Sequence, residues 1–184
     1  MGRASVKENK SVYQKTREQL GLTREKAAQC LTGLTEDRIE KIENGRTLLR
    51  PEDVLIMAHG YKAPVLRNHY CAKECPIGKD HVAPVTLTDL PQIVLQMLAS
   101  LGTLQKKRDV LIDITNDGQI QDEEIPDFVE IQAELDNMAM TVDALKLWSE
   151  QMLAEGKINL ALYEKHKDQQ KHILFRGILR NRMC

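Results

Sequence analysis

The sequence predicts an all-α protein, and three observations support this fold class. Only 7 of the 184 residues are aromatic, whereas Leu, Ile, Met, Ala, Glu, Lys and Gln are abundant, as is typical of helical proteins. Apolar residues recur every three or four positions through much of the chain after residue 87. Extended structure is expected only in short stretches such as residues 81–86. We therefore expect an N-terminal domain of five helices and a C-terminal antiparallel, coiled-coil-like domain of three helices.

The first half of the chain contains signals for a series of short helices after a polar, flexible arm. Thr35 is a favourable N-cap, Ile39 and Ile42 face inward, and Gly45 is a favourable C-cap. Pro51 suits the first turn of a further helix. The expected helices cover residues 12–20, 23–31, 35–44 and 51–60.

A fifth helix is expected at residues 66–75, where Pro76 and Gly78 would stop it. The stretch that follows contains Pro84 and has no helical period, so it is interpreted as a linker. The expected organisation is an arm at residues 1–11, a helical domain at 12–76, a linker at 77–86 and a second helical domain at 87–184.

The second half contains two long apolar runs with helical spacing, and a third helix is expected at about residues 158–180. Such spacing defines a seam that packs against another helix. The seam is equally compatible with the core of a monomer and with a dimer interface. The two runs are Leu90, Val94, Met97, Leu101, Leu104 and Leu111, then Ile131, Leu135, Met138, Val142, Leu145 and Met152.

Charge is distributed unevenly along the chain, although the formal net charge is only −1. Residues 1–81 contain 15 basic and 11 acidic side chains, and residues 82–184 contain 11 basic and 16 acidic ones. Within the second half, residues 109–155 carry 13 carboxylates against Lys146 alone, whereas residues 157–182 are mainly basic. The simplest use of this contrast is attraction between two helices or between subunits.

The stretch around the third helix resembles the Cro/phage-repressor-like (XRE) helix-turn-helix family. The resemblance covers residues 12–62 and rests on three runs: Thr23-Arg24-Glu25-Lys26-Ala27-Ala28, Gly33-Leu34-Thr35, and Ile39-Glu40-Lys41-Ile42-Glu43-Asn44-Gly45-Arg46-Thr47. It implies a five-helix DNA-binding domain, usually dimeric, that regulates transcription by placing its third helix in the major groove.

The resemblance also implies which side chains of this chain meet DNA. Glu36, Asp37 and Lys41 would face the bases, and Arg38 would lie near the edge of the groove. Glu43 is expected to be structural and to pair with an arginine. The remaining implied contacts, which include the two N-caps and residues that would face phosphate, are Thr23, Arg24, Thr35, Asn44, Arg46 and Thr47.

The carboxylates of the third helix admit two interpretations. Carboxylates can accept a hydrogen bond from the cytosine amino group, which would make Glu36 and Asp37 base-reading residues. Both also lie at a helix N-terminus, where a negative charge stabilises the helix without any ligand. The sequence leaves both interpretations open.

Two clusters raise the question of a metal site, although no cofactor is expected. Cys71 and Cys75 share a helix face. With His69 and His81 they could form a tetrahedral zinc set, or the two thiols alone could form a redox pair. The alternative, which we expect, is that the thiols pack the junction between the domains. Cys30 is expected in the core.

Residues 113–124 resemble a calcium-binding EF-hand loop, with Asp113, Asp117 and Glu124 as candidate ligands. The alternative, which we expect, is a helix end at Gly118 followed by an N-cap at Asp122.

The function expected from these observations is a sequence-specific transcriptional regulator that binds double-stranded DNA as a homodimer. The acidic C-terminal domain would offer a surface for a protein partner. We expect no enzyme, because no nucleophile elbow, phosphate loop, dinucleotide fingerprint or HExxH motif occurs. We expect a cytoplasmic protein, because the first residues are polar and no apolar run has the length of a membrane span. Two alternatives stay open: a protein-interaction module that does not bind DNA, and a metal- or redox-sensing regulator that uses Cys71 and Cys75.

Overall fold

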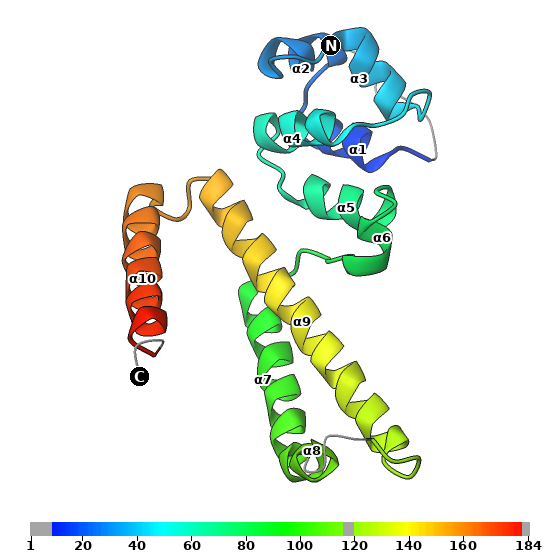
Figure 1. The fold of residues 1–184 in the computed structure, drawn as a ribbon. Coiled ribbons are helices and arrows are strands. Elements are labelled where there is room, and N and C mark those ends of the chain that lie inside the picture. Colours follow the sequence, from blue (N-terminus) through cyan, green and yellow to red (C-terminus); the bar gives the residue numbers. More distant parts are fainter. Residues whose placement is uncertain (1–8, 116–119, 182–184) are drawn as a thin grey trace.

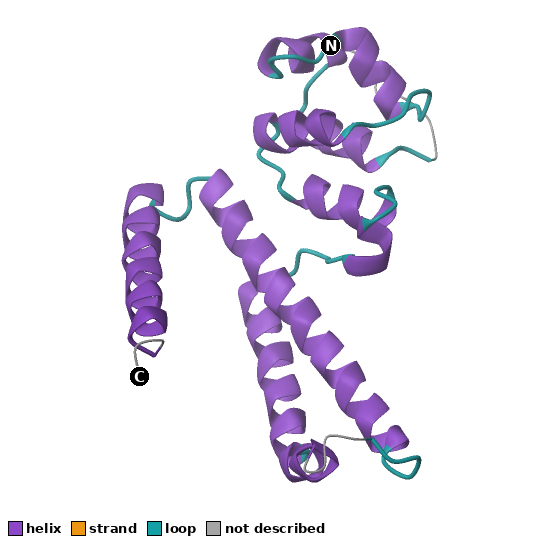
Figure 2. Ribbon diagram, viewed as in Figure 1, coloured by secondary structure: helices purple, strands orange, loops and turns teal. Residues whose placement is uncertain are grey.

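The computed structural model describes residues 9–115 and 120–181, with residues 115 and 171–181 described in their backbone only. Within these residues the chain forms ten α-helices and no strand (Figures 1 and 2). The all-α fold class is therefore confirmed. None of the described helices is both long and apolar enough to cross a membrane.

The first six helices form a compact group. The five helices expected between residues 12 and 76 are all present, and each boundary lies within two residues of its expected place. A sixth, four-residue helix lies inside the expected linker. The helices are α1 (Val12–Gln19), α2 (Arg24–Cys30), α3 (Glu36–Glu43), α4 (Pro51–Gly60), α5 (Val65–Lys73) and α6 (Gly78–His81).

Side-chain caps begin the first three helices. The side chains of Ser11, Thr23 and Thr35 each accept a hydrogen bond from the backbone N–H three residues later, at 3.2 Å. Such a cap stabilises a helix by about 1 kcal/mol. α3 ends where Gly45 adopts a φ of 65°, a left-handed conformation that glycine adopts without strain.

The core of this group contains the residues that the helical pattern turns inward. Ile39, Met57 and Leu66 are fully buried, and Ala27 and Leu31 pack with them. Each large buried side chain contributes about 1.5–3 kcal/mol through the hydrophobic effect. The expectation that Cys30 is buried is wrong, because the inward stripe of α2 passes through Ala27 and Leu31 and leaves the Cys30 side chain exposed.

The segment after α5 turns back against that helix. A Cβ atom added at Gly78 would lie 2.2 Å from the carbonyl oxygen of Cys71, so the corner between α5 and α6 requires glycine. Beyond α6 the chain is extended, and Asn68 of α5 holds it by donating to Ala83 O at 3.1 Å and accepting from Val85 N at 2.9 Å. The domain boundaries proposed from the sequence stay a prediction.

The remaining helices are α7 (Leu90–Lys106), α8 (Arg108–Thr115), α9 (Ile125–Ala154) and α10 (Leu160–Asn181). α7 and α9 run antiparallel and pack along much of α7, whereas α10 lies apart from this pair (Figure 1). The antiparallel pairing is thus confirmed for α7 and α9. Polar contacts join the end of α9 to α5 and to the turn before it. Arg67 of α5 pairs with Glu150 at 2.5 Å, and Gln151 Nε2 donates to Lys62 O in the turn between α4 and α5 at 3.1 Å.

The buried stripe of α7 differs from the expected seam. Ile93 and Ser100 are buried, whereas Val94 and Leu101 of the expected seam are exposed. The physical reason is that apolar side chains cover more than half of the circumference of α7. Spacing alone therefore cannot select the arc that faces α9.

Candidate nucleic-acid interface

Glu43, the last residue of α3, is the centre of the polar network that orients this helix. Its side chain is fully buried and accepts from Arg17 Nε at 2.5 Å, Arg17 Nη2 at 3.0 Å and Arg24 Nε at 2.8 Å. The hydrogen bonds to Glu43 raise the pKa of the Arg17 guanidinium. Because Arg17 lies on α1 and Arg24 on α2, one carboxylate connects three helices. The structural role expected for Glu43 is confirmed.

Arg38 fastens α3 to the start of α4. Its guanidinium donates to Thr47 Oγ1 at 2.5 Å, to Leu48 O at 3.0 Å and to Asp53 Oδ2 at 2.5 Å. Asp53 also accepts from the backbone N–H of Arg50, which caps α4. Arg38 is therefore hydrogen-bonded to Thr47, to the loop before α4 and to α4 itself. The family resemblance implied that Arg38 and Thr47 contact DNA.

The exposed face of α3 carries Glu36, Asp37 and Lys41. Lys41 Nζ lies 2.7 Å from Asp37 Oδ2, and both side chains are at least half exposed. An exposed pair of this kind stabilises a helix by about 0.3–0.5 kcal/mol, so a phosphate or a base can displace the aspartate with little loss. Lys41 is consequently available to a ligand.

The end of α3 presents a second available cation. The Arg46 side chain is 69% exposed and approaches Glu40 Oε1 only to 3.6 Å. Asn44 is more constrained, because its Nδ2 donates to Glu40 O at 2.9 Å and to Glu40 Oε1 at 3.2 Å. Of Arg24, Arg38, Lys41 and Arg46, Arg46 has the most exposed side chain.

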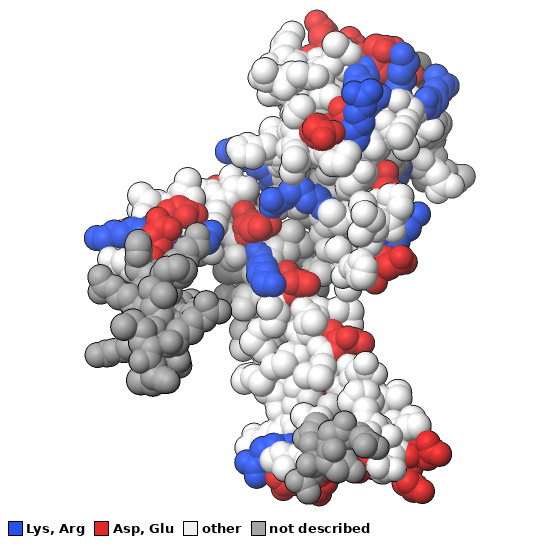
Figure 3. Space-filling view, in the orientation of Figure 1, with Lys and Arg blue, Asp and Glu red and all other residues white. Residues whose placement is uncertain are grey.

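A hollow of about 470 Å³ lies between the starts of α2 and α3 and brings several expected site residues together. Three of its five lining residues are carboxylates, and its one cation, Arg24, is bound to Glu43. The N-terminus of α3 would attract an anion, but the negative charges of these carboxylates repel one. Figure 3 accordingly shows acidic and basic side chains interspersed over the N-terminal helices on the face in view. The residues lining the hollow are Arg24, Thr35, Glu36, Asp37 and Glu40.

The comparison with protein families decides the nature of this region. A family model described as a helix-turn-helix domain matches residues 14–69, from α1 into α5. Residues 14–69 form an XRE-like helix-turn-helix domain. The match contains every residue that the sequence proposed for DNA contact, and it ends before α6 and α7–α10. No curated protein and no solved structure matches the chain.

Sequence reasoning missed the specific partners that immobilise the helix-turn-helix domain. Arg17 lies outside the quoted family runs, yet it supplies two of the three hydrogen bonds to Glu43. Asp53 lies in the first turn of α4, where a carboxylate is favourable, and it also accepts a hydrogen bond from Arg38. A search for arginines able to pair with Glu43 and with Asp53 would have suggested both the Arg17–Glu43 and the Arg38–Asp53 pairs.

The cysteine and histidine cluster is dispersed around α5. Cys71 and Cys75 are half-buried, and Cys75 Sγ accepts from Gly78 N at 3.5 Å. His69 packs edge-on against Tyr13, with ring centroids 6.1 Å apart, and His81 is exposed. Among the described residues, no group of three or more His, Cys, Asp or Glu side chains is arranged to hold a metal ion.

The calcium-loop hypothesis falls largely outside the described residues, because Asp117 and Gly118 lie in the range 116–119. Asp113 belongs to α8. Glu124 accepts from Gln121 N at 2.8 Å and stands at the N-cap position of α9.

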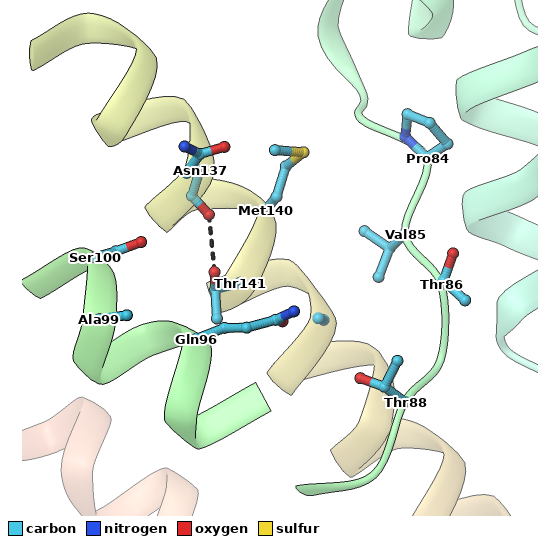
Figure 4. Close-up of a pocket in the computed structure, with 11 residues that line it drawn as sticks. Pro84, Val85, Thr86, Thr88, Gln96, Ala99, Ser100, Asn137, Met140 and Thr141 are labelled. Atoms are coloured by element: carbon cyan, nitrogen blue, oxygen red, sulfur yellow. Dashed lines mark hydrogen bonds between the residues drawn. The ribbon is translucent and has the colours of Figure 1, made fainter. Parts of the chain in front are cut away.

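A second hollow, of about 450 Å³, lies where the extended segment after α6 passes α7 and α9 (Figure 4). Val85 and Thr88 form one wall, and Ser100 and Met140 face them from the two helices. On the α9 side of the hollow, Thr141 donates to Asn137 O at 2.8 Å. Every lining residue is neutral, so the hollow does not resemble a site for phosphate or for a metal ion.

Proposed function

We propose that this protein is a cytoplasmic, sequence-specific transcriptional regulator that binds double-stranded DNA as a homodimer. The observation that carries the proposal is the helix-turn-helix domain at residues 14–69, with α3 presenting two available cations, Lys41 and Arg46. Lys41 would meet a base or a phosphate, and Arg46 would meet a phosphate at the end of the helix. A regulator of this kind performs no catalysis.

Thr23, Thr35 and Asn44 would complete the contacts at the edges of the groove. Glu43 keeps α3 in place for this docking from inside the domain. Arg24 and Arg38 act mainly by holding α3, since both are hydrogen-bonded to buried or half-buried carboxylates. Phosphate neutralisation through α3 would therefore depend on few side chains, which favours a dimer over a single domain.

A homodimer would add the weak contacts of two domains. Helix-turn-helix dimers place their recognition helices about 34 Å apart along DNA, so the operator would be a near-palindrome with half-sites one helical turn apart.

The test is selection of DNA from a random library by the full-length protein, followed by gel shift with three variants. Lys41→Ala and Arg46→Ala are expected to weaken binding by about tenfold each, or roughly 1–2 kcal/mol. Lys146→Ala is the matched control. Lys146 is also exposed and pairs with Asp143 on its own helix, but it belongs to α9, outside the helix-turn-helix domain. Failure to enrich any DNA would reject the proposal.

Asp37→Asn separates the two interpretations of the carboxylates. If Asp37 accepts from a cytosine amino group, the variant loses preference at one base pair. If Asp37 only stabilises the N-terminus of α3, the variant binds every DNA more tightly, because one repulsion of phosphate is removed.

A second candidate function is supported by the acidic hollow between α2 and α3. Its three carboxylates would accept a basic segment of a protein partner better than they would accept DNA. This interaction module would bind no DNA in the selection experiment, and Lys41→Ala would leave its affinity for the partner nearly unchanged.

A further inference from the structure

The outer face of α7 is apolar and uncovered. Leu95 and Leu98 are 68% and 59% exposed, and Val94 and Leu101 extend the same stripe along the helix. These four residues, the α7 stripe, lie on a different arc from Ile93 and Ser100, which are buried in the pair with α9. A continuous uncovered stripe of this kind marks an interaction surface.

α10 has a matching uncovered apolar face. Leu162 is more than half exposed, and with Ile158 and Tyr163 it lines an open, mainly apolar hollow at the start of the helix. Because α10 lies apart from the α7–α9 pair in Figure 1, no helix within the described residues of one copy covers the α7 stripe or this face. A 22-residue helix gains most of its stability from packing of such a face.

Charge indicates which surfaces meet. α9 is acidic and α10 is basic, as the sequence distribution requires. Carboxylates of α9 pair with Arg67, Lys107 and Lys146, and Lys167 of α10 pairs with Glu164 within α10. Among the side chains that the structure describes, which for α10 end at residue 170, no ion pair joins α9 to α10.

We propose that in the dimer α10 of each copy packs across the α7 stripe of the other copy, with its basic side chains beside the acidic flank of the other α9. Two reciprocal contacts of this kind are isologous, as a two-fold dimer requires. The inference rests on the homodimer of the proposed function and supplies its interface. It also explains why α10 is separated from its own α9.

The experiment measures the mass of the full-length protein in solution, without DNA, over a range of concentrations. Leu98→Glu places a charge in the α7 stripe, and Leu162→Glu places a charge in the apolar face of α10. Each is expected to raise the dimer dissociation constant by about tenfold or more. Leu48→Glu is the matched control, because Leu48 is 86% exposed and lies in the loop before α4. Circular dichroism checks that each variant keeps its helix content.

Mixing the two variants distinguishes exchange from other dimers. Leu98→Glu retains a good α10 and Leu162→Glu retains a good stripe, so a mixed dimer keeps one of the two contacts intact. Recovery of dimer on mixing is therefore expected. In a separate test, the Lys165→Glu/Lys167→Glu variant should weaken the dimer, most strongly at low salt, because salt screens the attraction between the charges.

Three results would overturn the exchange. They are a wild-type protein that stays monomeric, a dimer that persists in either variant as it does in Leu48→Glu, and a mixture that does not recover. Packing of α10 on its own chain predicts the first result, and direct pairing of two α7 stripes predicts that Leu162→Glu stays dimeric. DNA binding is measured separately, so loss of the exchange and loss of the DNA-binding proposal are different outcomes.

Discussion

Individual residues hold α3 in its orientation within the helix-turn-helix domain, and Glu43 is central among them because it connects three helices. A buried carboxylate is tolerated only when it is paired and hydrogen-bonded, and Arg17 and Arg24 supply that pairing. Neither arginine is then free for DNA. The number of basic residues in a helix-turn-helix domain therefore overstates the number available to phosphate. Of the four cations implied by the resemblance, Arg24, Arg38, Lys41 and Arg46, only Lys41 and Arg46 lack a hydrogen bond to a buried carboxylate among the described residues.

Removal of Arg17 should damage the fold itself. Arg17→Met leaves Glu43 buried with only Arg24 as a partner, and we expect a loss of about 3 kcal/mol in the free energy of unfolding. Urea denaturation followed by circular dichroism measures it. Arg46→Met, which changes an exposed arginine, should stay within about 0.5 kcal/mol of wild type. Equal stability of the two variants would contradict the role given to Glu43.

Tyr13 and Tyr61 form a natural matched pair. Tyr13 donates to Glu74 Oε1 at 2.8 Å, whereas the buried hydroxyl of Tyr61 has no hydrogen-bond partner among the described residues. Tyr61→Phe should therefore leave stability at pH 7 unchanged or slightly higher, and Tyr13→Phe should lower it by about 1 kcal/mol. Urea midpoints of the two variants measure the difference, and the reverse order would refute it.

The same two tyrosines predict a loss of stability at alkaline pH. Burial raises the pKa of both hydroxyls above the ordinary value, and the hydrogen bond to Glu74 raises that of Tyr13 further. The folded protein therefore keeps protons that the unfolded chain loses above a pH of about 10. Stability should be complete below that pH and should fall as pH rises beyond it. Tyr13→Phe and Tyr61→Phe should each reduce this fall, and an unchanged pH profile in both would contradict the account.

At the scale of helices, the sequence could predict α1 to α5 because each has an independent end signal. Thr23 and Thr35 cap helices in the structure as the sequence predicts, and Gly45 ends α3 with a left-handed φ. The buried arc of α7 could not be predicted in the same way. Its apolar residues surround the helix, and the choice between Ile93 and Val94 is made only by the position of α9.

Two glycines test how helices depend on space at one backbone atom. Gly78→Ala places a Cβ 2.2 Å from Cys71 O, so α5 and α6 must separate, and we expect a loss of at least about 2 kcal/mol. Gly102 lies inside α7 with nothing within 4 Å of its added Cβ. Gly102→Ala should therefore raise stability by about 0.5–1 kcal/mol. Thermal unfolding of both variants gives the comparison, and a stable Gly78→Ala protein would contradict the close approach.

At the scale of the whole molecule, the segment that connects the helix-turn-helix domain to the α7–α9 pair is held against α5. Asn68 of α5 donates to Ala83 O and accepts from Val85 N. The sequence contained no local signal for this attachment, since the partners are 15 and 17 residues apart and neither is a charged pair. Only the folded path of the chain brings them together.

Loss of this attachment should expose the connecting segment. In Asn68→Ala we expect faster cleavage between residues 82 and 89 in limited proteolysis, because two hydrogen bonds to the backbone are removed. Gln132→Ala, at an exposed position on α9 that does not line the hollow beside this segment, is the control and should be cleaved as slowly as wild type. Equal cleavage of the two variants would show that Asn68 does not hold the segment.

The most direct test of DNA binding through α3 is the salt dependence of affinity for a selected DNA, compared between wild type and Arg46→Ala. Each phosphate contact contributes about 0.9 to the slope of log affinity against log salt. We predict that Arg46→Ala lowers the magnitude of this slope by about 1, whereas Lys146→Ala leaves it unchanged. An identical slope in wild type and Arg46→Ala would contradict the proposed docking of α3 on DNA.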